Sequence, residues 1–420
     1  MNEILTERYH LFEPNSYIVF TAELSGDPDG SALLSAVRKA YAANEATTSR
    51  IVIRDDGRAF YEPMAQTGCT VCVAQGEWQE IVQENEKKPF ELQAGELMRC
   101  FIIPGTEKTR LLLIAHHLVG DGLSIVCFLK DVMHALAGEE LVYTPMSLVT
   151  KDSMPCGERL PFIVKLYAEL CNRKWAKLGL HYDWQDYESV HYKYWGSHSS
   201  EMLFRTLDRE HTEQITVRAK QAGVSVNSYL VTALLMSDRH NYRIGIPVSV
   251  RAENNKTMAN LVSGVQIFHH YKRKESFAEN ARDIHRKVSR ARCKSLWFYL
   301  LLRTVFTPAM IDGALMAAHG CCTVPFLKRF AFVMNYERNK SLDIGLSNLT
   351  VADIPYATGA YTLDNLVFIP PMVSYANYIF GAVTQNGKLT LSCRRVMPDG
   401  KSAQSLFDSW ISALLHGGVD

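Results

Sequence analysis

The sequence has almost no excess charge of either sign. Lysine and arginine total 45, aspartate and glutamate total 44, and the formal net charge is +1. A chain this balanced lacks the overall positive field that draws proteins to nucleic acids or to anionic membranes. We therefore expect no nucleic-acid partner. Residues 1–8 carry acids where a secretory signal would be basic and then apolar, so we expect a cytoplasmic protein.

The sequence also lacks a complete metal-binding motif. Its ten cysteines are scattered, mostly in apolar segments such as those around Cys100 and Cys127, which is typical of reduced, buried thiols. Cys69 and Cys72 have the spacing of half a zinc site, but no second pair completes it. We therefore expect no metal and no permanently bound cofactor.

One stretch organises the rest of the chain: residues 111–123, Leu-Leu-Leu-Ile-Ala-His-His-Leu-Val-Gly-Asp-Gly-Leu. The apolar run at its start predicts a strand buried on both faces, and the residues after it predict a helix. The polar turn between them carries His116, His117 and Asp121, at a place where side chains commonly meet a ligand. Adjacent histidines on an extended backbone point to opposite faces, so we expect one in a cavity and the other in packing.

The segment 116–122, His-His-Leu-Val-Gly-Asp-Gly, resembles the His-His-x-x-x-Asp-Gly motif of the CoA-dependent acyltransferase superfamily. That superfamily includes chloramphenicol acetyltransferase, plant BAHD acyltransferases and the condensation domains of peptide synthetases. Residues 88–92, Lys-Pro-Phe-Glu-Leu, and 95–99, Gly-Glu-Leu-Met-Arg, resemble the run that precedes the motif in these proteins. The resemblance implies an α/β fold of two chloramphenicol-acetyltransferase-like lobes with an active-site tunnel between them.

The resemblance also implies roles for the residues of the motif. His117 matches the general base, which can take and return a proton near neutral pH, and His116 matches a packing or hydrogen-bonding residue. Asp121 matches a mainly structural aspartate that pairs with an arginine, and Arg251, at a strand end in the second half, matches that arginine. Gly122 is expected to keep the backbone close to the thioester end of the donor. There is a simpler interpretation of each charged residue: Asp121 would be a helix N-cap, and Arg251 would be a solvent-exposed residue at the end of a strand.

A second resemblance lies far along the chain. Ser347-Asn348-Leu349 resembles a Ser-Asn-Leu-Gly segment that lies at the tunnel in condensation and acetyltransferase relatives. We therefore expect Ser347 and Asn348 to bind substrate, and either is a candidate donor to the oxyanion of the reaction. This chain has Thr350 where that segment has glycine. The departure puts close approach of a ligand at this position in question.

The alternation of strands and helices divides the chain into three parts. We predict an N-terminal lobe over residues 1–142 that carries the His-His motif, a linker and inter-lobe segment over 143–200, and a C-terminal lobe over 201–420. The apolar stretch 295–320 predicts two amphipathic helices that either cover an acyl channel or pack in the core, and we expect no transmembrane segment. The run from Phe330 to Tyr336 predicts a strand.

These observations predict an acyltransferase. It would move an acyl group, acetyl among the candidates, from a thioester to the hydroxyl or amine of a small molecule, with acyl-CoA as co-substrate. One alternative is a stand-alone condensation-type enzyme whose donor is held by an acyl carrier protein in trans. The other is an inactive relative used as a binding module, against which the intact His117, Asp121 and Gly122 argue.

Overall fold

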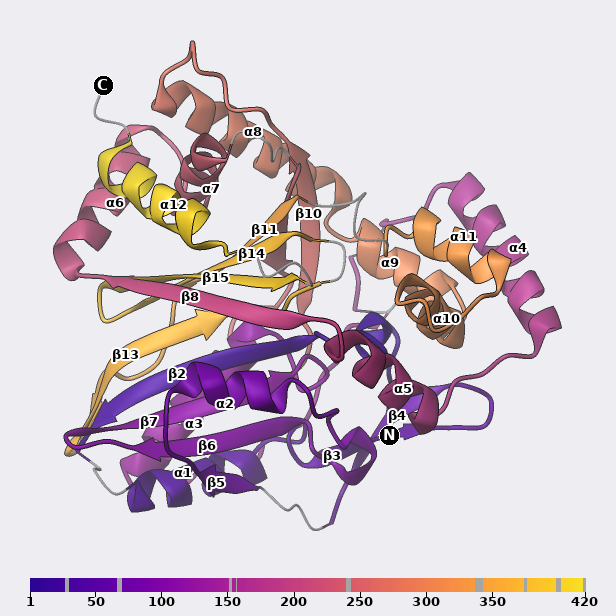
Figure 1. The fold of residues 1–420 in the computed structure, drawn as a ribbon, viewed down its shortest axis with the longest axis horizontal. Coiled ribbons are helices and arrows are strands. Elements are labelled where there is room, and N and C mark those ends of the chain that lie inside the picture. Colours follow the sequence, from indigo (N-terminus) through magenta and orange to yellow (C-terminus); the bar gives the residue numbers. More distant parts are fainter. Residues whose placement is uncertain are drawn as a thin grey trace.

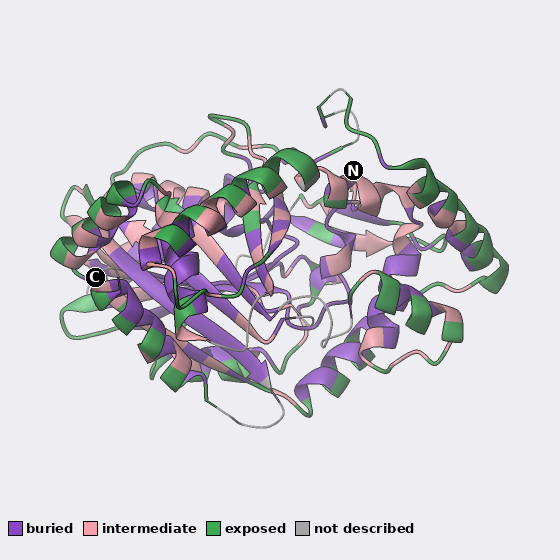
Figure 2. Cartoon of the chain, turned by 90° about the horizontal axis from the view of Figure 1, so that it is seen from above, coloured by how far each residue is buried: buried purple, intermediate pink, exposed green. Residues whose placement is uncertain are grey.

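The computed structural model of the chain describes residues 1–26, 30–65, 70–150, 153–155, 157–238, 243–336, 343–373, 376–397 and 402–417. Within these ranges the strands form two six-stranded sheets and one three-stranded sheet. Helices cover the outer face of each large sheet, α1 and α3 on one and α6, α7, α8 and α12 on the other (Figure 1). The strands are largely buried and the outer helix surfaces are exposed (Figure 2).

The first large sheet has the strand order β12-β13-β2-β7-β6-β5. Its strands are β2 (Tyr17–Ser25), β5 (Val71–Val73), β6 (Met98–Pro104), β7 (Lys108–His116), β12 (Ala357–Thr358) and β13 (Tyr361–Ile369). The apolar run 111–115 lies in β7, between β2 and β6, and is at most 1% exposed. The fully buried strand predicted from this run is therefore confirmed.

The second large sheet has the order β10-β9-β11-β14-β15-β8. Its strands are β8 (Ser199–Leu207), β9 (Arg243–Ser249), β10 (Val262–Phe268), β11 (Ile344–Val351), β14 (Tyr378–Gln385) and β15 (Lys388–Met397). The small sheet consists of β1 (Asn2–Glu3), β3 (Ser49–Ile53) and β4 (Ala59–Pro63). The two large sheets meet where β13 approaches β14 and β15.

The helices of the described ranges fall into three groups. The first group is α1 (Ser31–Ala42), α2 (Trp78–Asn85), α3 (Gly122–Leu136), α4 (Phe162–Leu178) and α5 (Trp184–Trp195). The second is α6 (Arg209–Gln221), α7 (Val226–Ser237), α8 (Phe277–Ser295) and α12 (Gln404–His416). The third is α9 (Phe298–Val305), α10 (Pro308–Ala318) and α11 (Pro325–Val333), which lie beside α4 in Figure 1.

Two sequence predictions need correction. Residues 357–369 were assigned to the C-terminal lobe, but β13 pairs with β2 and so completes the first sheet. The run from Phe330 to Tyr336 was predicted as a strand, but its first part belongs to α11. Pro325 starts this helix, and Leu327, Phe330 and Ala331 recur at helical spacing on its buried side. Taken by itself, the run 330–336 resembles a strand, because the residues that start the helix lie before it.

The stretch 295–320 forms two helices, as predicted. Side chains of α9 line the cavity described below, whereas α10 is buried in the core. Among the described residues no single helix is long and apolar enough to cross a membrane. The helical segments 277–305 and 308–318, taken together, are long and apolar enough, but the chain bends by 99° at the break between them.

Candidate active site

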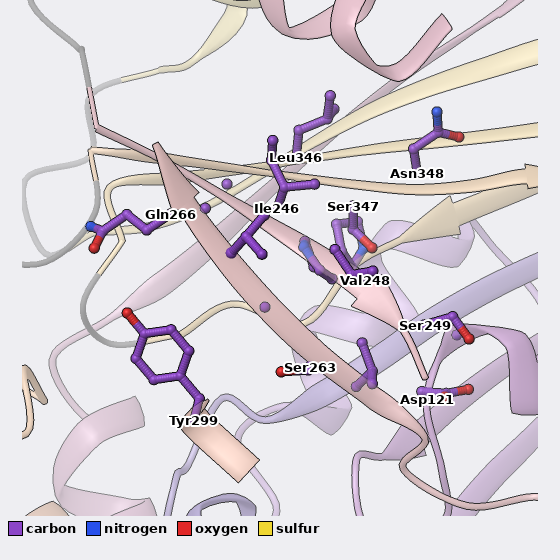
Figure 3. A pocket seen from close by; sticks show the side chains of 18 of the residues that line it. Asp121, Ile246, Val248, Ser249, Ser263, Gln266, Tyr299, Leu346, Ser347 and Asn348 are labelled. Atoms are coloured by element: carbon purple, nitrogen blue, oxygen red, sulfur yellow. The ribbon is translucent and has the colours of Figure 1, made fainter. Parts of the chain in front are cut away.

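A cavity of about 1370 Å³ is lined by residues of both large sheets and of helices α6 to α9. Its wall includes His117, Asp121 and Gly122 from the end of β7 and the start of α3. Strands β9, β10 and β11 contribute the side chains seen in Figure 3, among them Ile246, Val248, Ser263, Ser347 and Asn348. Residues from both halves of the chain therefore share one cavity, and a tunnel between two lobes stays a prediction.

The two histidines of the motif have different surroundings. His117 lines the cavity, and its backbone N–H donates to the carbonyl of Ser16 at 2.9 Å, which fixes the chain just beyond β7. His116 is buried away from the cavity: its Nδ1 accepts from the N–H of Leu118 at 3.2 Å, and its ring lies edge-on to Phe90. Burial lowers the pKa of His116 to about 3, so this ring stays neutral. The predicted division, one histidine in a cavity and one in packing, is confirmed.

Asn260, a buried residue just before β10, fixes the tautomer of His117. Its Nδ2 donates to the His117 carbonyl oxygen at 2.6 Å, and its Oδ1 lies 2.7 Å from the ring Nδ1. Because a carbonyl oxygen only accepts, the amide has one orientation, and Nδ1 must donate to Oδ1. The neutral ring therefore presents an unprotonated Nε2, the form that can act as a base. Within the described part of the chain no hydrogen bond occupies this Nε2.

A second imidazole, that of His10, stacks on His117. The ring centroids are 3.9 Å apart and the planes differ by 12°. Burial lowers the pKa of His10 well below its ordinary value, and the neighbouring His117 and Arg303 add to this effect. Burial also lowers the pKa of His117, although the charge of Asp121 and the hydrogen bond to Asn260 oppose it. Both rings are therefore neutral at neutral pH.

Asp121 is at once a helix cap and one half of an ion pair. Its carboxylate accepts from the N–H of Ser124 at 2.9 Å, at the start of α3, and from the N–H of Leu261 at 3.0 Å. It also lies 3.0 Å from Nη2 of Arg251, and both side chains are less than a tenth exposed. Arg251 in turn donates to the carbonyl of Thr257 at 2.6 Å. The pairing predicted from the sequence is present, and it ties the motif turn to the second half of the chain.

Gly122 allows close packing at the first turn of α3. A Cβ atom on this residue would lie 2.8 Å from Cδ2 of Leu349 and 3.5 Å from the ring of Phe368, so a side chain would require the end of Leu349 to shift. Gly122 also lines the cavity, where the expected approach of the thioester stays a prediction.

Ser347 and Asn348 share the cavity with His117, as expected from the sequence. The Asn348 Oδ1 accepts from the N–H of Thr350 at 2.8 Å, so part of this amide is used within its own strand. Thr350, which stands where the resembling segment has glycine, has a φ of 60°, and a β-branched residue is strained in this left-handed region. A role for Ser347 or Asn348 at the oxyanion stays a prediction.

No cluster of three or more histidine, cysteine, aspartate or glutamate side chains suited to a metal ion occurs in the described ranges. Cys69, of the Cys-x-x-Cys pair, lies outside those ranges. The cysteines that are described are free thiols.

Sequence reasoning missed His10 and Asn260. Asn260 lies 143 residues from His117, and neither it nor His10 stands in a motif that the sequence reveals. The only signal near Asn260 is its place nine residues beyond Arg251, at the start of an apolar run. Asn260 reaches His117 from the second half of the chain, and His10 stacks on it from the N-terminal part, so both contacts arise only in the folded chain.

Comparisons with known proteins define the class of fold. The sequence matches no protein-family model and no curated protein, but solved structures match over nearly its whole length. The first condensation domain of the CDA synthetase is 14% identical, covers 100% of this chain and 97% of its own, and gives a TM-score of 0.64. Polyketide synthase associated protein 5 from Mycobacterium tuberculosis is 13% identical, with 100% and 98% covered and a TM-score of 0.62.

An acetyltransferase has the same architecture. The trichothecene 15-O-acetyltransferase of Fusarium sporotrichioides is 11% identical, with 98% of this chain and 94% of that chain covered and a TM-score of 0.63. The chain therefore has the fold of the condensation domains and CoA-dependent acyltransferases, as the sequence predicted. At these identities the likeness describes the fold, and the chemistry must be argued from the site.

Proposed function

We propose that this protein transfers an acyl group from a thioester, with free acyl-CoA as the first candidate donor, to a hydroxyl or amine of a small molecule. The observation that carries the proposal is the state of His117: a neutral ring in a large cavity, with its proton held on Nδ1 by Asn260 and its Nε2 open. The cavity exceeds the range of about 300–1,000 Å³ typical of ligand sites, which suits two substrates held together.

In the proposed reaction, Nε2 of His117 takes the proton of the acceptor O–H or N–H as the acceptor attacks the thioester carbonyl. The tetrahedral intermediate then expels the thiolate, which receives the proton from Nε2. The hydrogen bond from Nδ1 to Asn260 keeps the ring in one orientation while it is charged. Asp121 is too well occupied by donors to exchange a proton, so its contribution is to hold the turn.

The runner-up is condensation with a donor delivered by a carrier protein. The likeness to condensation domains favours it, whereas the likeness to an acetyltransferase favours free acyl-CoA. The inactive-relative alternative is disfavoured by the intact arrangement around His117.

The proposed function is tested by incubating the protein with a panel of acetyl-CoA and longer acyl-CoAs and a set of alcohols and amines. Mass spectrometry should detect an acylated acceptor together with free CoA. If an acyl-CoA is only hydrolysed to its free acid, and no faster than with boiled protein, the proposal is contradicted for that donor. Product formed only when an acylated carrier protein replaces acyl-CoA would establish the runner-up instead.

The pH dependence of the reaction should report the pKa of His117. Only the neutral ring accepts a proton, and burial lowers its pKa, so kcat/KM should stay constant near neutral pH and fall only below pH 6.5. Asn260→Asp places a carboxylate against Nδ1–H, which favours the charged ring and should move this acid limb to higher pH. Asn260→Ala, which removes the hydrogen bond without adding charge, is the control. An unchanged limb in Asn260→Asp would contradict the assigned contact.

A further inference from the structure

The edge of the molecule formed by α4 and α11 exposes large apolar side chains. On α4, Phe162, Ile163, Leu166 and Leu170 are 80, 74, 44 and 56% exposed, and on α11 Phe332 and Val333 are 45 and 47% exposed. The two helices lie side by side at the edge of the molecule, outside both large sheets (Figure 1), and Nζ of Lys174 lies over the ring of Phe326, 4.8 Å from its centroid. We call these six apolar side chains and the basic residues around them the α4–α11 face. Large exposed apolar side chains gathered on neighbouring helices are typical of an interaction site.

The outer side of α4 is not needed to hold the helix in place. Its inner side buries Ala168, Cys171 and Trp175. Asn172 adds two hydrogen bonds to the chain between α9 and α10: its Nδ2 donates to the carbonyl of Val305, and its Oδ1 accepts from the N–H of Thr307, both at 2.9 Å. The apolar residues on the outer side therefore contribute nothing to the core, and their exposure calls for another explanation.

The same two helices carry exposed positive charge. The basic residues are Lys165, Arg173, Lys174 and Lys177 on α4 and Lys328 and Arg329 on α11. The single carboxylate on the two helices is Glu169, which pairs with Arg173. Because the whole chain has a net charge of only +1, this is a local concentration of charge. Lysine is depleted from the cores of protein–protein interfaces, whereas apolar helix faces rimmed with lysine and arginine bind anionic lipid surfaces.

The α4–α11 face continues into the cavity. Ile163 and Val333 are exposed on this face and also line the cavity. Tyr299, on α9, is 38% exposed and lines the cavity as well (Figure 3). Leu302 and Phe306 extend the apolar wall from there toward the interior. A ligand that leaves a lipid surface at this edge would therefore meet cavity-lining side chains that are mostly apolar, with Arg292 and Arg303 among them.

We propose that the α4–α11 face docks on an anionic lipid surface. The apolar side chains of α4 and α11 enter the boundary between headgroups and acyl chains, and the lysines and arginines extend to the phosphates. This docking does not depend on the proposed function. One consequence does rest on the proposed function: the acceptor or the acyl donor would carry a long apolar part and reach His117 from the lipid.

Flotation with vesicles tests the docking without any substrate. The parent protein should float with vesicles of phosphatidylcholine containing about one third phosphatidylglycerol, and much less with phosphatidylcholine alone, with binding weakened by salt. Phe162→Ser combined with Leu166→Ser should lower the partition coefficient about tenfold or more. Phe268→Ser, at a 56% exposed phenylalanine at the end of β10, is the matched control and should bind like the parent.

A second variant separates loss of charge from loss of folding. Lys328→Gln combined with Arg329→Gln should lower binding to the anionic vesicles by roughly tenfold and leave the circular dichroism spectrum unchanged. Neither Phe162 nor Leu166 lines the cavity, so any turnover of water-soluble substrates should survive in the serine variant. The proposal is overturned if the parent does not float, or if Phe268→Ser loses as much binding as the α4 variant. Two other results would also overturn it, each in the absence of vesicle binding. One is a dimer formed through this face, seen by light scattering, and the other is binding of an acidic carrier protein to this face.

Discussion

His117→Ala is expected to lower kcat/KM for acyl transfer by roughly 10²–10⁴-fold, the usual contribution of a positioned general base. The His117 ring lines the cavity with its Nε2 open. The His10 ring stacked on it also lines the cavity, but its Nδ1 partner is the Ser16 hydroxyl and not Asn260. Because the acceptor is still bound next to the thioester, a residual rate from proximity should remain. The measurement is product formation by mass spectrometry at saturating acyl-CoA.

His116→Ala is the matched control for this variant. His116 is the neighbouring residue of the same type, but it is buried against Phe90 outside the cavity. This variant should lose stability more than turnover, measured by thermal unfolding and by the rate of the folded fraction. Near-normal turnover in a folded His117→Ala protein would contradict the proposed mechanism.

Breaking the ion pair between Asp121 and Arg251 is expected to cost roughly 3–5 kcal/mol of unfolding free energy, because removing one partner leaves a buried charge without its counterion. The variants are Asp121→Asn and Arg251→Gln, and urea unfolding measures the loss. Activity should fall as well, since this pair holds the turn that carries His117. In Asp121→Asn the acid limb of the pH profile should persist, because Asp121 does not transfer the proton, but it should move to lower pH, because the charge of Asp121 raises the pKa of His117.

A surface ion pair provides the comparison. Lys130 on α3 pairs with Asp353, whose side chain is 91% exposed. Lys130→Gln should therefore cost about 0–1 kcal/mol, the usual range for exposed pairs. The double variant Asp121→Asn with Arg251→Gln should be less destabilised than the sum of the single variants, because the two groups interact directly. Additive losses in this cycle would show that the two residues act independently.

Local sequence signals predicted the elements whose cause is local. The run 111–115 is apolar on both faces and therefore becomes an inner strand, and Asp121 precedes helical spacing and therefore caps α3. The strand predicted from Phe330 to Tyr336 was wrong, because apolar and aromatic residues in a short window fit a strand and a buried helix equally well. Its helical start, at Pro325, lies outside that window.

The sequence by itself determined the motif, the strand-turn-helix that presents it, the fold class and the candidates His117, Asp121 and Arg251. Only the tertiary structure decided how they work, because the deciding contacts join residues far apart in the chain. Asn260 selects the tautomer of His117 across 143 residues, and Arg251 reaches Asp121 across 130. The α4–α11 face likewise arises from helices that are distant in sequence and meet only in the fold. Such contacts leave no local periodicity, since their geometry depends on how the two sheets pack.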